Sequence, residues 1–320
     1  MILTVDNGQS VTKIACVDDH YDLEGIVQEP ISPDDIQARI IAESRQSGLS
    51  ELAIATTWFT SNNKRQALGK LESRRKVIID LDEIERETGV RKIQLYNDAE
   101  ATALALNTPF DGITIQTGDI SQPAIKTLVY VGTGFQMVRT HYDSQRNAYL
   151  PHYGGGLRAA LPMSLLDIVD RSFLERVAEC AMVERISQLR HTHILGANGL
   201  QNVHRALTGE NKKTREIIDG ASSAGVTFDI YSGLLGRCLQ NFASNSGFSQ
   251  AVYFGGTFAP VIAPHLNLDT VREAFAVSDN ITIGAYNTIP LKIMNEAFAA
   301  NKGAAFGLRN RIETTSCDPL

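Results

Sequence analysis

An asparagine and an aspartate stand side by side in the stretch QLYNDAEATALAL (94–106), between an apolar run and residues that favour helix. A carboxylate in such a place can accept the proton of a substrate hydroxyl, and the amide beside it can hydrogen-bond a neighbouring hydroxyl. The same residue types are preferred at helix N-caps, which is the more common explanation on local sequence alone. Asn97 and Asp98 are therefore candidate catalytic residues and candidate cap residues at once.

Three apolar runs, each of which predicts a strand, are followed at once by a glycine turn. Glycine in this position lets backbone amides approach a phosphate, because no Cβ stands in the way. One such turn is more often an ordinary hairpin turn, whereas three in the order hairpin, hairpin, strand-to-helix favour a nucleotide site in a cleft. The turns are Asp6-Asn7-Gly8-Gln9-Ser10, Gly132-Thr133-Gly134 and Gly255-Gly256-Thr257. In the first, Asp6 could hold a metal-bound water.

Three other sets of residues are weaker candidates. Arg74 and Arg75 fit a solvated loop face better than a site for an anionic substrate. His191 and His193 form an H-x-H pair that could bind a metal from a strand, yet no cysteine or further carboxylate is placed to complete the site. The cysteines form no C-x-x-C pair, so we expect free thiols without a zinc site or a disulfide framework. They are Cys16, Cys180, Cys238 and Cys317.

Composition narrows the class of protein. The 320 residues are 43% hydrophobic and 21% charged, which is ordinary for a folded protein of one or two domains. A formal net charge of -6 argues against a nucleic-acid binder, which would show a basic patch. The N-terminus has neither a basic region nor a signal-length apolar run, and no run approaches 18 apolar residues. We therefore expect a soluble cytoplasmic protein with neither a membrane nor a nucleic acid as partner.

The order of predicted elements indicates an α/β protein. After an N-terminal hairpin, strands and helices alternate along the first 110 residues. The polar stretch 60–76 predicts a loop, and so does 107–125. From about residue 151 a glycine-rich loop is followed by long helical patterns at 164–190, 198–208, 212–222 and 224–246. A last strand and a helix over 301–312 close the chain.

In their order and approximate spacing, seven segments resemble the bacterial glucokinase family, within the actin-like, hexokinase and sugar-kinase ATPase fold. VDNGQSVTKIACVD stands at the first phosphate loop, LYNDAEATALAL at the strand–Asn-Asp–helix element and VYVGTGFQMV at the second phosphate loop. YLPHYGGGLRAALP stands at the sugar loop, ILGANGLQNVHRAL at the helix start that follows, AVYFGGTFAPVI at the adenosine loop and NKGAAFGLRNRI at the final helix. The likeness covers nearly the whole chain.

The resemblance implies an α/β fold of the actin-like ATPase (ribonuclease H-like) type, with two lobes and an interlobe cleft for nucleotide and sugar. A smaller domain would cover 1–110 and include the returning C-terminal helix (301–313). A larger domain would cover 111–300. The oligomeric state stays open, with a homodimer as one alternative.

The resemblance also implies an ATP-dependent carbohydrate kinase and assigns roles to residues. Asp98 is then the general base that accepts the sugar hydroxyl proton, with ATP and Mg²⁺ as cofactors. The sugar would be bound by Asn97, His152, Tyr153 and Gly155, of which His152 is assigned from position alone. The nucleotide would be bound by Asp6 (through a water on Mg²⁺), Gly8, Gln9, Ser10, Gly132, Thr133, Gly134, Gly255, Gly256 and Thr257.

Three departures from the family pattern concern the sugar. The family's sugar loop has a Glu and a His in a G-E-G-G-H pattern, where this chain has Tyr153 and Gly156. A further sugar-binding Glu of the family is replaced by Thr192. Glucose is thus an uncertain substrate. The alternative to a kinase is a catalytically weak or inactive relative that binds nucleotide or sugar as a regulatory or interaction protein.

Overall fold

The contacts within the computed structural model divide the chain into two compact units. The first comprises Met1–Phe110, Tyr142–Tyr153 and Phe298–Leu320, and the second Asp111–His141 and Gly154–Ala297. Tyr142–Tyr153 lies inside the range that the sequence suggests for the larger domain, and it is grouped with the first unit. The structure describes residues 1–8, 11–61, 63–71, 74–118, 125–132, 135–153, 161–245, 249–277 and 286–313.

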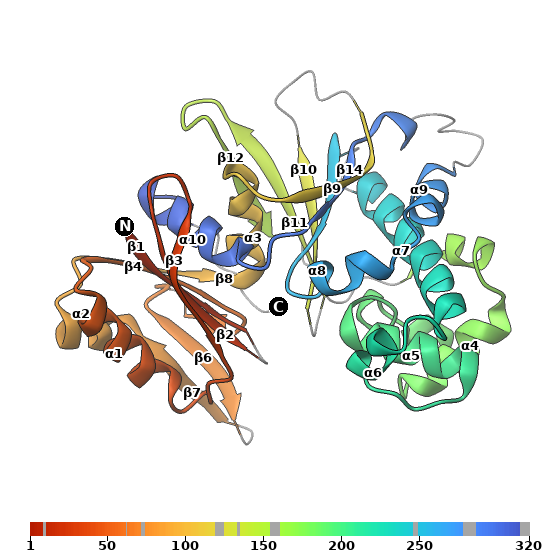
Figure 1. Ribbon diagram of the computed structural model, residues 1–320, viewed down its shortest axis with the longest axis horizontal. Coiled ribbons are helices and arrows are strands. Elements are labelled where there is room, and N and C mark those ends of the chain that lie inside the picture. The colour runs from red at the N-terminus through yellow and green to blue at the C-terminus, as the bar shows by residue number, and fades with distance from the viewer. Residues whose placement is uncertain are drawn as a thin grey trace. The chain divides into compact units, whose positions relative to one another are not determined.

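The first unit is built on a five-stranded sheet with the order β3-β2-β1-β4-β8 (Figure 1). The predicted N-terminal hairpin is confirmed as β1 and β2, which pair antiparallel, while β1, β4 and β8 run parallel. These strands are β1 (Ile2–Asn7), β2 (Thr12–Val17), β3 (Leu23–Glu29), β4 (Glu51–Thr56) and β8 (Lys92–Asn97). The carboxyl ends of three parallel strands therefore meet at one edge of this sheet.

A second, three-stranded antiparallel sheet has the order β5-β6-β7, formed by β5 (Phe59–Thr60), β6 (Gln66–Leu71) and β7 (Arg74–Asp80). The prediction of a loop over 60–76 is therefore wrong. The stretch is too polar to show a strand pattern. Its Ala67, with Ile78 and Ile79 from the end of β7, is buried in the core that includes α1 only once the strands pair. The side chains of Arg74 and Arg75 lie outside the described part.

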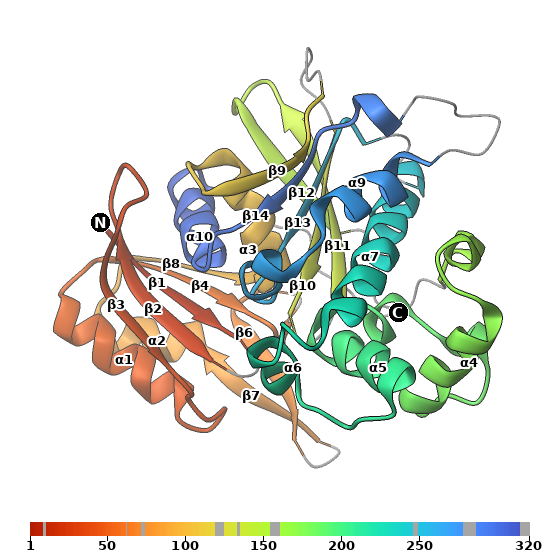
Figure 2. The ribbon, with the colours of Figure 1, turned by 45° about the vertical axis from the view of Figure 1, so that its right-hand side comes forward.

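Helices cover both faces of the first sheet. They are α1 (Ile36–Ser47), α2 (Leu81–Thr88), α3 (Asp98–Leu104) with the 3-10 turn η1 (Ala105–Asn107), and α10 (Ala299–Arg309). Helix α2 begins at Asp80, whose side chain accepts hydrogen bonds from two backbone amides, as the sequence suggests. Helix α10, from the end of the chain, packs on α3 and on the first strands (Figures 1 and 2).

The second unit repeats the topology of the first. The six-stranded sheet has the order β12-β11-β10-β13-β14-β9, and all of its strands except β12 lie mainly in the second unit. In it, β10 pairs antiparallel with β11 and parallel with β13, and β13 runs parallel to β14. Without β9, this is the 3-2-1-4-5 order of the first sheet. The strands are β9 (Gly112–Gln116), β10 (Lys126–Val131), β11 (Phe135–Asp143), β12 (Ala148–Tyr153), β13 (Ala251–Gly255) and β14 (Leu291–Met294). Strand β9 lies in the range expected to be a loop.

In the second unit, the helical pattern over 164–190 gives a shorter helix than the sequence suggests. The pattern over 164–190 contains a single α-helix, which begins after Asp170 because that side chain accepts from the Phe173 amide, and it ends before Met182 with its left-handed backbone. The α-helices are α4 (Arg171–Cys180), α5 (Gly196–Thr208), α6 (Thr214–Asp219), α7 (Gly225–Asn245), α8 (Ala259–Ile262) and α9 (Leu268–Ala276). The 3-10 turns are η3 (Met163–Asp167), η4 (Ile186–Gln188), η5 (His191–His193), η6 (Ala263–His265) and η7 (Tyr286–Thr288).

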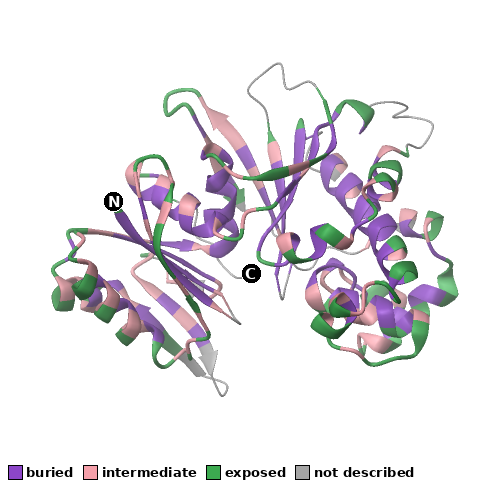
Figure 3. Ribbon diagram, viewed as in Figure 1, coloured by how far each residue is buried: buried purple, intermediate pink, exposed green. Residues whose placement is uncertain are grey.

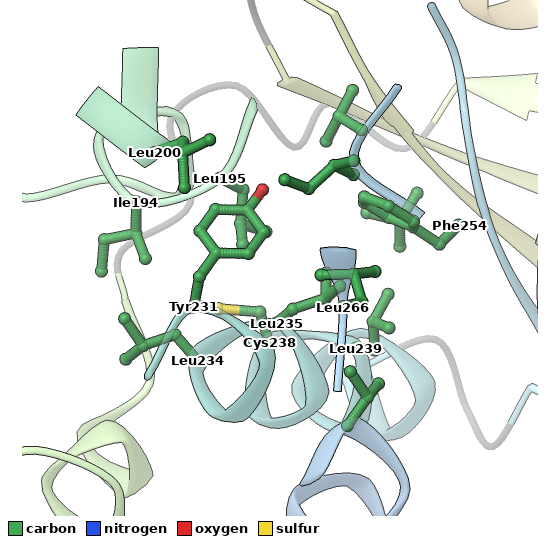
Figure 4. Packing of buried hydrophobic residues seen from close by; sticks show 14 of the residues in the cluster. Ile194, Leu195, Leu200, Tyr231, Leu234, Leu235, Cys238, Leu239, Phe254 and Leu266 are labelled. Carbon is green, nitrogen blue, oxygen red and sulfur yellow. The ribbon is translucent and has the colours of Figure 1, made fainter. Parts of the chain in front are cut away.

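Helix α7 is the centre of the second unit's core. Its residues at helical spacing are buried against α5 and the sheet, as the sequence pattern predicts. Figure 4 shows Tyr231 extending from α7 toward Leu195 and Leu200, with Leu234, Leu235 and Leu239 along the same helix. The Tyr231 hydroxyl accepts a hydrogen bond from the Gly196 amide, 3.2 Å away, so α7 fixes the first turn of α5.

Candidate functional site

Two carboxylates lie at the carboxyl edge of the first unit's parallel strands. Asp6 is the sixth residue of the chain and near the end of β1, and it is in register with Ala55 on β4, which is in turn in register with Tyr96 on β8. Asp98 follows β8 two residues after Tyr96. Tyr96 lies two strand spacings from Asp6, about 10 Å. Both carboxylates are buried, at 2% and 1% relative exposure, so neither is an ordinary surface charge.

Asn97 and Asp98 have separate local roles. Asn97 is the N-cap of α3: its Oδ1 accepts from the amides of Ala99 (3.0 Å) and Glu100 (3.4 Å). Asp98 is the first residue of the helix, and its Oδ1 accepts from the Ala99 amide at 2.9 Å, which fixes the direction of the carboxylate. The cap interpretation therefore belongs to Asn97, and it leaves the Asn97 Nδ2 as the atom that can donate to a ligand.

Helix α3 is buried along its whole length (Figure 3) because α10 lies directly on it. Two glycines on one face of α10 permit this approach. A Cβ at Gly303 would lie 1.7 Å from the Ala101 carbonyl oxygen, and one at Gly307 would lie 2.6 Å from the Tyr96 hydroxyl. The end of the chain thus fixes the position of the helix that carries Asp98.

Asp6 faces Lys13 across the hairpin, in the register of β1 and β2. The Lys13 Nζ lies 3.6 Å from Asp6 Oδ2, and both side chains are buried. Burial raises the pKa of Asp6, and the charge and hydrogen bond of Lys13 oppose that rise. The other oxygen, Oδ1, is buried and has no hydrogen-bond partner within the described residues; the same is true of the neighbouring Asn7 Nδ2. Open polar atoms at a glycine turn indicate a place for a ligand or an ordered water.

The turn that follows β1 is tight at Gly8. Its amide donates to the Val11 carbonyl oxygen at 3.2 Å, and a Cβ on Gly8 would approach that oxygen to 2.9 Å. Gln9 and Ser10, which complete the predicted phosphate loop, lie outside the described residues.

Strand β12 carries two of the predicted sugar-binding residues and is tied to the helix of Asp98. Asn107, at the end of η1, accepts from the Tyr149 amide at 2.6 Å and donates to the Tyr149 carbonyl at 2.9 Å. His152 is exposed on this strand, and of Tyr153 the backbone is described but not the side chain. Gly155 and Gly156 lie outside the described residues.

In the second unit, two glycine turns adjoin each other because β10 and β13 are parallel neighbours. Gly256 has a φ of 98°, and a Cβ there would lie 2.4 Å from the Val131 carbonyl oxygen, so only glycine fits. A Cβ on Gly132 would lie 3.0 Å from Thr257 Oγ1, which places these two residues side by side. Thr257 is exposed, and Gly255 is buried at the end of β13. Thr133 and Gly134 are not described.

The N-terminus of α5 joins the same place. The Ala197 amide donates to the Gly132 carbonyl at 3.3 Å. The first turn of this 13-residue helix therefore lies beside the Gly132 and Gly256 turns. Because the Gly196 and Ala197 amides already donate to Tyr231 and Gly132, the two glycine turns, rather than these amides, are the backbone that could admit a phosphate group.

The H-x-H pair does not have the strand placement that was expected for it. His191 and His193 are in the 3-10 turn η5, not on a strand, and His191 stacks on Phe135 and Phe242 in the core. His193 Nδ1 accepts from the Arg190 amide at 3.1 Å, and burial, with the charge of Arg190, lowers its pKa. Within the described ranges, no group of three or more His, Cys, Asp or Glu side chains is placed to hold a metal ion.

Sequence reasoning missed Lys13 and Asn107. Lys13 could have been found from hairpin pairing: with a turn centred near residues 9 and 10, positions 6 and 13 lie opposite each other. No signal in the sequence marks Asn107, because its partner Tyr149 is 42 positions away. Among the described helices, none is long and apolar enough to cross a membrane.

Comparison with known proteins assigns the chain to a family. A family model described as Glucokinase matches residues 7–311. The chain belongs to the glucokinase family. Curated glucokinases from Cupriavidus metallidurans and Sinorhizobium medicae are each 25% identical to it over 232 and 230 residues, which is 68% of this chain. These matches cover 66% and 65% of the relatives, so the chain spans just under two thirds of their length.

Solved glucokinase structures share the fold. A glucokinase from an Antarctic psychrotroph superposes with a TM-score of 0.74 at 16% identity, over 97% of this chain and 98% of that chain. A glucokinase from Balamuthia mandrillaris, solved in complex with glucose, gives a TM-score of 0.71 at 15% identity, over 96% and 92%. The predicted fold class is therefore confirmed: the chain has the actin-like ATPase fold of the glucokinase family.

Proposed function

We propose that this protein is an ATP-dependent sugar kinase in which Asp98 is the general base. The observation that carries the proposal is the pair of buried carboxylates, Asp6 and Asp98, at the carboxyl edge of the parallel strands β1, β4 and β8. Ligands of open α/β sheets bind outside the carboxyl ends of such strands. Membership of the glucokinase family supports the same reaction class.

Asp98 accepts the proton of the sugar hydroxyl. The hydroxyl oxygen then forms a bond to the γ-phosphorus, the bond from that phosphorus to the β,γ-bridging oxygen breaks, and the products are a sugar phosphate and ADP. The Ala99 amide holds the carboxylate in direction, and Asn97 offers its Nδ2 to a neighbouring hydroxyl. Burial keeps bulk water from competing for the proton.

The glycine turns are the proposed contacts to the nucleotide. Gly8 in the first unit, with Gln9 and Ser10, and Gly132 in the second, with Thr133 and Gly134, would hold phosphates through backbone amides. Gly255, Gly256 and Thr257 would border the adenosine. The close approach at Gly256 and the Gly132–Thr257 contact fit this role, since the backbone is left open where a side chain would fill the space.

The residues present also fit the magnesium ion that accompanies ATP. Asp6 offers a buried carboxylate oxygen that has no partner among the described residues, at the end of a strand and beside a glycine turn. When bound with ATP, hydrated Mg²⁺ would supply charge neutralisation to the transferring group. Asp6 would hold one of the waters of that ion.

The sugar need not be glucose. Two carboxylates that grip sugar hydroxyls in the family are replaced, at Tyr153 and Thr192, and each lost charged acceptor costs ~1.5–3 kcal/mol. The combined loss weakens glucose binding by roughly two to four powers of ten. Another substrate would be favoured if His152, Arg158 or Arg74 takes over the lost contacts. An anionic sugar is one class to test. Without such replacement, a nucleotide- or sugar-binding regulatory protein is the second candidate.

The test is a coupled ADP-release assay over hexoses, amino sugars and sugar acids. We expect turnover on at least one sugar, and we expect Asp98→Asn to lower kcat by about 10²–10⁴-fold because the base is lost. Binding of ADP, measured by calorimetry, should stay unchanged in the same variant. No turnover on any sugar, or equal rates for wild type and Asp98→Asn, would refute the kinase.

Thermal unfolding with Mg·ATP distinguishes a protein that binds nucleotide without turnover from one that neither binds nucleotide nor turns over. A ligand at 100 times its dissociation constant stabilises the folded protein by about 2.7 kcal/mol. Stabilisation by nucleotide without turnover favours the regulatory protein. No stabilisation by nucleotide or by any sugar refutes both candidates.

A further inference from the structure

Lys13 is a charged side chain in an unusual place. It lies on β2 directly opposite Asp6, is 6% exposed, and its Nζ is 3.6 Å from Asp6 Oδ2. On its other side the ammonium lies 5.5 Å from the centre of the Phe298 ring, within cation–π distance. No sequence motif assigns it a role, and the residues assigned to the nucleotide do not include it.

Filling the core does not explain a lysine here. The same face of the sheet is packed with small apolar residues such as Ala53 and Ala55, and an apolar side chain would fit there at lower cost. A buried ion pair contributes little net stability, because desolvating two charges offsets their attraction. The charge of Lys13 therefore calls for a functional explanation.

The C-terminal helix holds Lys13 in place. Asn301 on α10 is fully buried, and its Nδ2 donates to the Lys13 carbonyl oxygen at 3.3 Å and to Thr4 Oγ1 at 3.1 Å. Phe298, just before α10, supplies the ring below the ammonium. Segments from opposite ends of the chain thus fix one lysine against one carboxylate.

We propose that Lys13 is a positioning residue of the nucleotide site: it binds Asp6 through Oδ2 and leaves Oδ1 as the oxygen that receives the hydrated magnesium of the nucleotide. The two oxygens of Asp6 differ in this way, since Oδ1 is buried and has no partner among the described residues. The inference rests on the proposed function, because it concerns the magnesium that accompanies ATP. Lys13 itself touches neither sugar nor phosphate in this scheme.

Calorimetric binding of ADP, with Mg²⁺ and with EDTA in its place, tests the inference without any turnover. For Lys13→Met we expect affinity for Mg·ADP to fall about 10–100-fold, the usual effect of losing a residue that orients a metal contact. Affinity for metal-free ADP should change little. Lys13→Arg, which keeps the positive charge, should recover part of the loss. A merely structural lysine would lower both affinities together.

The matched control is Lys92→Met. Lys92 forms an ion pair with Glu51 at 3.3 Å, on the same sheet but at the amino ends of β8 and β4. Its loss should leave both ADP affinities at the wild-type value. Far-UV circular dichroism and denaturant unfolding verify that each variant is folded.

Lys13→Met leaves the buried charge of Asp6 without its partner, and this variant could fail to fold. A second pair of variants keeps the inference testable in that case. Asp6→Asn and Asp6→Asn/Lys13→Met should bind Mg·ADP equally weakly, since Lys13 acts through Asp6. A double variant that is clearly weaker than Asp6→Asn would overturn the inference by showing that Lys13 contacts the nucleotide. If folded Lys13→Met binds Mg·ADP with wild-type affinity, the inference about Lys13 is overturned but the proposed function stands. If the wild type does not bind ADP at all, the proposed function is refuted as well.

Discussion

The contact between α10 and α3 gives a quantitative prediction for Gly303→Ala. The new Cβ would lie 1.7 Å from the Ala101 carbonyl oxygen and 2.7 Å from the Ala105 amide nitrogen. Real Cβ atoms do not approach such atoms within 3.0 Å. Because both neighbours are helix backbone, neither can rotate away, and α10 must move outward from α3 by more than 1 Å.

The cost follows from the packing that this shift disturbs. The face of α10 that meets the core carries Ala300, Ala304, Ala305 and Leu308, all buried. A gap of 0.5–1 Å already forfeits about a quarter to a half of a dispersion contact. Overpacking of this kind costs about 1–3 kcal/mol or more, and alanine regains only about 1 kcal/mol of helix propensity over glycine. Taking the upper end of that cost, because both clashing atoms are backbone, we expect a net loss of about 2 kcal/mol in the free energy of unfolding.

The measurement is unfolding by heat and by denaturant, followed by circular dichroism. At about 2–4 °C per kcal/mol, Gly303→Ala should lower Tm by roughly 4–8 °C. Since α3 carries Asp98, turnover should fall as well at temperatures where the variant is folded; a misplacement of 1 Å can cost about 100-fold.

Gly225→Ala is the control for Gly303→Ala. Gly225 begins α7, and a Cβ there would meet nothing within 4 Å, so this variant should be as stable as the wild type or more so. If Gly303→Ala unfolds within about 0.5 kcal/mol of Gly225→Ala, the spread of ordinary surface substitutions, the close packing of the two helices is refuted.

Two further predictions concern single side chains. Asn107→Ala removes three hydrogen bonds, to Leu104 and twice to Tyr149, and should cost about 2–3 kcal/mol in denaturant unfolding; a loss below about 0.5 kcal/mol would contradict the role of Asn107 in holding β12. Burial, and to a lesser extent the charge of Lys292, lowers the pKa of Lys126 from 10.5 to about 8. Between pH 8 and pH 10.5 the unfolded chain therefore binds more protons than the folded chain, so the free energy of unfolding rises with pH. Lys126→Met should therefore raise the denaturation midpoint relative to wild type at pH 7, with the gain shrinking toward pH 10.5; a gain that is constant with pH would contradict the lowered pKa of Lys126 as its cause.

Much of the fold could be read from the sequence because its signals are local. The hairpin around Gly8 and the cap at Asp80 depend on neighbours within a few residues. The likeness among the three strand–glycine turns also had a structural basis, since Gly8 and Gly132 occupy the same hairpin of two sheets with the same strand order. Strands β6 and β7 were missed because their stability comes from pairing and from α1, not from their own pattern.

The candidate site divides in the same way. Neighbouring residue types are enough to predict that Asn97 and Asp98 join a strand to a helix and that glycines follow the strands. The folded chain was needed to show that the cap is Asn97, that Asp6 is buried against Lys13, and that Gly303 lets α10 approach the helix of Asp98. Those facts depend on register between strands and on packing between segments far apart in the chain, and no local pattern of residue types encodes them.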